Sequence, residues 1–336
     1  MGRTLPRVVT FLFFGSILAG AARPASAGVA DPDRAARAIG YLRSQQRPNG
    51  SIPAFSPIGS TADAVLAIVS AGVGPRVMAH ALGYLRSQTE AGHVSTTGLR
   101  AKVVLAVAAA GGDPRAFGGH DLVREIKATM DPDGHFADTA VFDDAMAVLA
   151  IEAAGAILPR GTRRWLRDAQ CPDGGWAYDA PYDPAADDEH CVADPAADFF
   201  SSDTNTTSYV VQGLVAAGVA TWSQDPFAFF DLARDPLRGG WAYSTAFVAT
   251  DANSTALVLQ AYAATGTAPP GGGPAALRAL QRTRCGAWAY SWNGDQRGAP
   301  DVGATIGAVP GLLLEPLPLA PAPVTAPAPA TPGCAV

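Results

Sequence analysis

The chain has 336 residues, of which 30 are acidic and 24 are basic, so its formal net charge is −6. An acidic protein of this kind is poorly suited to nucleic acid or to anionic lipid surfaces, because both carry the same sign of charge. Hydrophobic residues make up 48% of the sequence, and a chain of this length accommodates one domain with a substantial core.

Residues 1–27 have the three parts of a secretory signal peptide. Arg3 and Arg7 give a positively charged start, residues 8–18 are apolar, and small residues at 25–27 suit cleavage. The apolar part is shorter than the roughly 20 residues that a membrane span needs. We therefore expect export, a mature chain that begins at Gly28, no stable membrane span, and a secreted or extracytoplasmic location.

Six turns that contain Gly recur along the rest of the chain, and one bulky residue follows each of them. A repeat of 40 to 65 residues is one supersecondary unit that cannot bury its apolar face alone, so the units must pack against one another. The last three copies share the sequence Trp-Ala-Tyr, which follows Gly or Gly-Ala. The bulky residues are Ile52, Val94, Phe136, Trp176, Trp241 and Trp288.

Each repeat is predicted to form two helices, one before the turn and one after it. The first helix is apolar on one face, and the second is apolar nearly all round, so the second must be covered on most sides. The one-face segments are 34–46, 76–88, 120–130, 162–170, 226–233 and 274–282. The apolar helices are expected to start near residues 61, 99, 143, 205, 253 and 303. Six such hairpins predict an all-α protein with an outer ring of helices around an inner ring.

Two segments lie outside the repeats. Residues 179–200 form an acidic insertion in the fourth repeat, and we expect it to cover the end of the ring where the inner helices start. Residues 316–336 are rich in Pro and Ala with almost no charge, which predicts a disordered or extended tail. The expected organisation is therefore a signal peptide at 1–27, a ring domain at 28–315 and a tail at 316–336.

The chain has four cysteines, and export favours disulfides between them. Cys171 and Cys191 bracket the acidic insertion and are the preferred pair, whereas a bond between Cys285 and Cys334 would tie down the tail. A metal site would need Cys171, His190 and Cys191 to converge, and no paired Cys-x-x-Cys spacing supports one. We expect no metal and no cofactor.

The sequence from Gln170 to Trp176, Gln-Cys-Pro-Asp-Gly-Gly-Trp, resembles the Gln-Trp repeat motif of terpenoid cyclases and protein prenyltransferases. Residues 46–52 are a weaker copy, and Gln88 starts another. The resemblance implies an α/α-toroid of six helical hairpins, a fold that complement thioester domains and cobalamin carriers share. It also implies that the glutamines and tryptophans are structural residues that tie an outer helix to the turn. This structural set is Gln46, Gln170, Trp176, Trp241 and Trp288.

The active sites of these related families are not recognisable in the sequence. Class II terpene cyclases protonate their substrate with an Asp-x-Asp-Asp motif, and the matching stretch here places Asn205 where the acid should stand. An amide cannot deliver that proton. The zinc ligands of prenyltransferases and the Gly-Cys-Gly-Glu-Gln thioester are also missing. The resemblance therefore implies the toroid fold without the active sites of the terpene cyclases, the prenyltransferases or the thioester proteins.

Polar residues recur at the starts of the inner helices. Asp203, Asp251 and Asp301 align with one another, and Asn205 and Asn253 follow two of them. Each suits a helix N-cap, because its side chain can accept a free backbone N–H. The inner helices all start at one end of the ring, so these caps are also expected to converge around a mouth that binds a small molecule. The candidate ligand-binding residues, besides Asp63, are Asp203, Asn205, Asp251, Asn253, Asp301, Asp143, Asp144, Arg100 and Lys102.

Two classes of function fit these observations. The first is an exported, monomeric binding or interaction module that holds an apolar or amphipathic small molecule or a protein partner, and the missing catalytic motifs favour it. The second is an enzyme, either a diverged terpenoid cyclase or a glycan lyase or hydrolase, because six-hairpin toroids host such enzymes. Adjacent carboxylates at Asp143 and Asp144 would suit acid/base catalysis, although neighbours on a helix do not face each other. Aromatic residues near the mouth would suit sugars; they are Tyr178, Tyr243, Tyr290 and Trp292.

Overall fold

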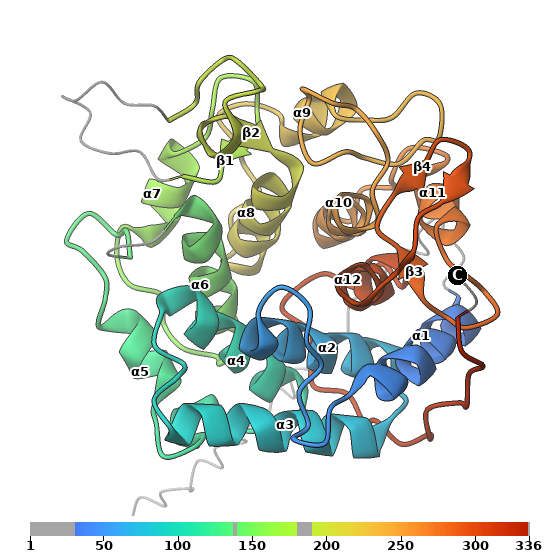
Figure 1. Ribbon diagram of the computed structural model, residues 1–336. Coiled ribbons are helices and arrows are strands. Elements are labelled where there is room, and N and C mark those ends of the chain that lie inside the picture. The colour runs from blue at the N-terminus through green and yellow to red at the C-terminus, as the bar shows by residue number, and fades with distance from the viewer. Residues whose placement is uncertain (1–30, 137–139, 180–189, 335–336) are drawn as a thin grey trace, which may run out of the picture.

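The computed structural model describes residues 31–136, 140–179 and 190–334, so the expected signal peptide lies outside the described residues. Within them, helices form two concentric rings (Figure 1). The inner ring consists of α2 (Pro57–Ala71), α4 (Thr97–Ala109), α6 (Val141–Ala153), α8 (Thr204–Ala216), α10 (Ala252–Thr265) and α12 (Val302–Leu312). The outer ring consists of α1 (Pro32–Gln45), α3 (Pro75–Glu90), α5 (Leu122–Lys127), α7 (Thr162–Asp168), α9 (Pro226–Leu232) and α11 (Gly273–Ala279).

The predicted all-α toroid is confirmed, and each inner helix begins within four residues of its expected start. Neighbouring inner helices pack side by side around the ring, and α12 packs against α2 to close it. The inner helices are apolar all round because they contact two inner neighbours and the outer ring at once; in α6, for example, residues 144–151 are all buried. Gly72 and Gly266 end α2 and α10 in the left-handed conformation, with φ of 67° and 70°.

A hydrogen bond that we call the turn tie fixes the bulky turn residue in five of the repeats. Its backbone N–H donates to a side-chain oxygen in the first turns of the following inner helix. The ties join Ile52 to Thr61 (2.9 Å), Phe136 to Asp144 (3.1 Å), Trp176 to Thr207 (2.9 Å), Trp241 to Thr255 (3.0 Å) and Trp288 to Thr305 (2.9 Å). The three tryptophans are fully buried, so the tie anchors the largest core side chains of the last three repeats.

Three glutamines link one repeat to the next. The side-chain amide of each donates to the carbonyl of the Gly in its own turn and to a carbonyl at or just before the next outer helix. The acceptors are Gly50 and Val77 for Gln46, Gly174 and Gln224 for Gln170, and Gly286 and Arg34 for Gln281. Gln281 is fully buried and reaches α1, so it joins the last repeat to the first.

The remaining regular structure consists of short pieces. Strand β1 (Trp176–Ala177) pairs with β2 (Ser202–Asp203), β3 (Trp288–Ala289) with β6 (Pro300–Asp301), and β4 (Trp292–Asn293) with β5 (Gln296–Arg297), all antiparallel. The 3₁₀-helices are η1 (Pro114–Ala116) and η2 (Asp198–Phe200). The first two strand pairs hold the bulky turn residue against the residue that precedes the next inner helix.

The C-terminal segment is extended as far as Cys334, which is one of the two forms expected for it, and it packs on the ring. It runs past the C-terminal ends of the inner helices, where its backbone meets side chains and backbone of the ring. The contacts join Glu315 to Gln260, Leu317 to Gln212, Ala326 to Gly74 and Ala328 to Arg43. Leu317 and Leu319 are buried. An extended, Pro-rich chain leaves its carbonyls free to accept these bonds, and Pro limits the entropy lost on ordering.

Both cysteine pairs are disulfides, with sequence separations of 20 for Cys171–Cys191 and 49 for Cys285–Cys334. The expected pair is therefore confirmed. The potential ligand atoms of Cys171, His190 and Cys191 do lie within 4.8 Å of one another. The two sulfurs are bonded to each other, however, which removes the thiolates that a metal requires. Among the described residues, no helix is both long enough and apolar enough to cross a membrane.

Candidate functional site

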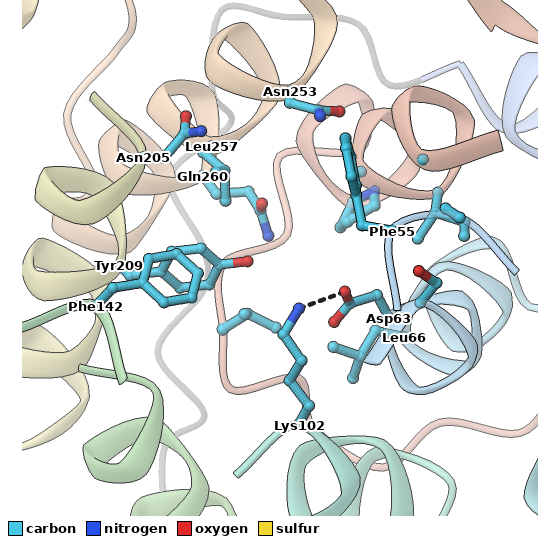
Figure 2. Close-up of a pocket in the computed structure, with 17 residues that line it drawn as sticks. Phe55, Asp63, Leu66, Lys102, Phe142, Asn205, Tyr209, Asn253, Leu257 and Gln260 are labelled. Carbon is cyan, nitrogen blue, oxygen red and sulfur yellow. Dashed lines mark hydrogen bonds and ion pairs between the residues drawn. The ribbon is translucent and has the colours of Figure 1, made fainter. Parts of the chain in front are cut away.

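A cavity of about 250 Å³ lies on the axis of the ring (Figure 2). Every inner helix contributes at least one side chain to its wall. Its lining is Ala54, Phe55, Ser60, Asp63, Leu66, Lys102, Phe142, Asn205, Tyr209, Asn253, Leu257, Gln260, Gly303, Ile306, Gly307, Pro310 and Leu317. Asn205 and Asn253 are the second residues of α8 and α10, whereas Leu317 lies beyond the other ends of these helices. The cavity therefore runs from the helix starts toward the C-terminal tail.

Most of the wall is apolar. Leu66, Leu257 and Ile306 come from three different inner helices, and Phe142 packs edge-on against Tyr209 with ring centroids 4.9 Å apart. Gly307 lets the Asn253 amide approach α12 closely, because an added Cβ would lie only 3.2 Å from its Oδ1. An apolar wall with a few polar groups is the usual form of a small-molecule site.

Lys102 and Asp63 form an ion pair inside this wall, with Nζ and Oδ2 2.6 Å apart. Burial disfavours the charge of Lys102, but the attraction and hydrogen bond of Asp63 outweigh it and raise the pKa of the ammonium above its usual value. Burial raises the pKa of the neighbouring Tyr209 to about 12, although Lys102 opposes this shift. Figure 2 shows the Lys102 ammonium and the Tyr209 hydroxyl pointing into the same space. At neutral pH the cavity therefore offers a charged pair and a neutral phenol.

Two amides lie at the helix-start end of the cavity. The Oδ1 atoms of Asn205 and Asn253 are buried, and neither has a hydrogen-bond partner among the described residues. Buried polar atoms are nearly always bonded, so such a pair calls for an explanation. Both residues line the cavity, which makes a bound molecule or ordered water a natural partner for their amides.

The structure brings only some of the predicted site residues to the cavity. Lys102, Asn205 and Asn253 line it, together with Asp63. Asp203, Asp251 and Asp301 do not line it and instead serve as N-caps. They accept the backbone N–H of Thr206 (2.8 Å), Ser254 (2.8 Å) and Ala304 (2.6 Å).

Burial also changes the titration of two of these caps. It raises the pKa of Asp203 to about 7 and that of Asp251 to about 6, although each accepts hydrogen bonds that favour the charged form. Their exposed fractions are only 1% and 4%. Asp203, Asp251 and Asp301 are therefore helix caps, as expected, and a part for them in ligand binding stays a prediction.

Asp143, Asp144 and Arg100 also lie off the cavity wall. Asp144 makes the turn tie of the third repeat and contacts His135 Nδ1 at 2.6 Å, so its carboxylate faces the core. Asp143 packs against the start of α4, where an added Cβ at Gly98 would lie 2.1 Å from its Oδ1. Burial and then the Asp144 charge raise the Asp143 pKa.

Arg100 pairs with Glu125 of α5, with Nε and Oε2 2.9 Å apart, and so contacts the outer ring instead of the axis.

The aromatic residues expected near the mouth have different roles. The ring of Tyr178 packs on Phe142 at 5.7 Å between centroids, next to the cavity wall. The backbone carbonyls of Tyr243 and Tyr290 accept N–H groups from the starts of α8 and α10. Trp292 lies on the β4–β5 hairpin, where the Arg238 guanidinium covers its ring at 4.2 Å.

Sequence reasoning missed several lining residues: Phe55, Phe142, Leu257, Gln260, Ile306 and Leu317. A usable signal was present on α10 and α12, because lining residues recur there every three or four positions, as at 253, 257 and 260. Counting along this face from each polar helix start would have found most of the wall. Leu317 had no such signal.

No family model matches this sequence, and no curated protein matches it. The solved structures with similar folds include the type II terpene cyclase MstE from Scytonema, with a TM-score of 0.58 and 14% identity over 84% of this chain and 96% of that one. A glycosidase variant in complex with glucose has a TM-score of 0.53 and 14% identity, and covers 85% of this chain and 97% of that one. An inactive variant of the α-1,6-mannanase GH76A of Salegentibacter sp. has a TM-score of 0.53 and 10% identity, over 84% and 98%. At such identities the likeness shows a shared α/α-toroid fold.

Proposed function

We propose that this chain is a non-catalytic binding protein that holds a small, largely apolar molecule in the axial cavity. The observation that carries the proposal is the construction of the cavity, to which all six inner helices and the tail contribute. Apolar walls provide the affinity, and the few polar groups orient the ligand.

The polar groups of the wall favour binding over chemistry. Among the described residues that line the cavity, Asp63 is the only carboxylate, and Lys102 holds it in an ion pair. A general acid or base needs a pKa near the working pH and access to the substrate. Asn205, in the place where cyclases carry their acid, has neither a proton to give nor a charge.

An enzyme acting on glycans or terpenoids is the alternative, and one observation favours it. The carboxyl groups of Asp203 and Asp251 have pKa values of about 7 and about 6, in the range that catalytic acids use. Oδ1 of each carboxyl group caps the helix that follows, however, and neither residue lines the cavity. We therefore favour the binding function over the enzymatic one.

The proposal can be tested with 1-octanol as a probe and isothermal titration calorimetry. The wild-type protein should bind the alcohol, and Leu257→Trp, which fills the cavity, should abolish binding. Ala79→Trp places the same bulk on an exposed position of α3 and should leave binding intact. Native mass spectrometry of protein taken from the culture medium should also detect a co-purified small molecule. Equal binding by Leu257→Trp and wild type, or no binding by wild type, would refute the proposal.

A further inference from the structure

We infer that the cavity selects an uncharged ligand with one polar oxygen at or near one end, such as a primary alcohol or a methyl ketone, and that Leu317 of the tail limits the length of its alkyl chain. This inference rests on the proposed binding function.

The polar end of the ligand is defined by hydrogen-bond donors. An ammonium group has three N–H donors, and the described contacts of Lys102 use one of them for Asp63. The Tyr209 hydroxyl points into the space beside it (Figure 2). Two convergent donors suit an oxygen acceptor of the ligand, such as a hydroxyl or carbonyl group.

The opposite charges in the cavity wall define the charge of the ligand. Lys102 and Asp63 neutralise each other at 2.6 Å, and they are the only charged side chains among the described lining residues. A carboxylate ligand would be attracted by Lys102 but repelled by Asp63. An ammonium ligand would be attracted by Asp63 but repelled by Lys102. Neither gain compensates for removing a charged group from water. A neutral ligand avoids this cost and leaves the ion pair intact.

The length of the ligand is defined by the tail. Leu317 forms part of the wall, and its N–H donates to Gln212 Oε1 of α8 at 2.8 Å. Gln260 of α10 donates to the carbonyl of Glu315 at 2.8 Å and itself lines the cavity. Two inner helices thus hold this segment in place, with Leu317 in the cavity wall. The cavity of about 250 Å³ has room for a small molecule between the helix starts and Leu317.

The charge selectivity is tested with 1-octanol, octanoate and octylammonium at pH 7, by calorimetry on the full mature chain. Wild type should bind octanol at least tenfold more tightly than either ion. Asp63→Asn should leave Lys102 free to pair with a ligand and raise octanoate affinity at least tenfold, while octanol affinity changes less than threefold. Asp113→Asn is the matched control, because Asp113 pairs with Arg115 on the surface, and it should change nothing. Equal binding of octanol and octanoate by wild type, or no gain in Asp63→Asn, would overturn the selectivity.

The length selectivity is tested with primary alcohols from six to twelve carbons. Leu317→Ala should move the optimum two to three carbons higher, and Leu317→Phe should move it lower. Leu319→Ala removes the same atoms from a buried tail residue outside the cavity wall, so its optimum should stay at the wild-type length. An unchanged optimum in both Leu317 variants, or an equal shift in Leu319→Ala, would overturn the role of Leu317. If wild type binds none of the alcohols and neither ion, the proposed function itself fails.

Discussion

Replacing Thr207 with valine should destabilise the protein through a single hydrogen bond. Thr207 and Trp176 are both fully buried, and the turn tie between them is 2.9 Å long. Valine has nearly the same shape as threonine, so the change leaves no large cavity and adds little strain. What remains is a buried Trp176 N–H without an acceptor, which costs about 1–3 kcal/mol.

Urea unfolding followed by far-UV circular dichroism measures this cost as a shift of the midpoint at constant m-value. Thr162→Val is the control, because Thr162 is equally buried but donates only to the Met130 sulfur at 3.7 Å, a weak acceptor. The control should cost clearly less than Thr207→Val, because only a weak hydrogen bond to sulfur is lost and no backbone N–H is left without an acceptor. Equal costs for the two variants would show that the turn tie contributes nothing to stability.

Three further changes test the remaining structural inferences. Burial raises the pKa of Asp203 to about 7 in the folded state, well above the ordinary value of an aspartate in the unfolded chain. The free energy of unfolding should therefore fall as pH rises from about 4 to about 7. Asp203→Asn retains an oxygen for the cap but has no carboxyl group to titrate, so its free energy of unfolding, measured by urea titration at each pH, should fall less steeply than that of wild type. Equal slopes for the variant and wild type would contradict the effect of burial on Asp203. Replacing Cys171 and Cys191 together with alanine should cost about 3 kcal/mol in the chain-entropy model, and peptide mapping that finds both thiols free in wild type would rule out the bond. Gln281→Leu should cost about 1–3 kcal/mol because the Gly286 and Arg34 carbonyls lose their donor, and an unchanged melting temperature would show that Gln281 does not stabilise the ring closure.

Local patterns in the sequence were enough to determine the architecture. Helix periodicity depends on residues three and four apart, so the apolar inner helices and one-face outer helices are visible without any tertiary information. Helix caps are equally local: Asp203 bonds the N–H only three residues later. The count of six turns then led to a closed ring, because each unit needs neighbours on both sides.

The cavity, by contrast, was decided by the tertiary structure. Asp203 and Asn205 are two positions apart and both polar, but the rotation of α8 turns one toward its own backbone and the other toward the axis. Lys102 meets Asp63 across 39 residues, and Leu317 meets Gln212 across 105. The sequence of the tail has no periodic pattern that predicts its course. The tail is held by hydrogen bonds to its carbonyls, by buried leucines and by a disulfide, and all of these depend on residues far away in the sequence. Local sequence therefore specified the ring, and only the packing of distant segments specified the cavity wall.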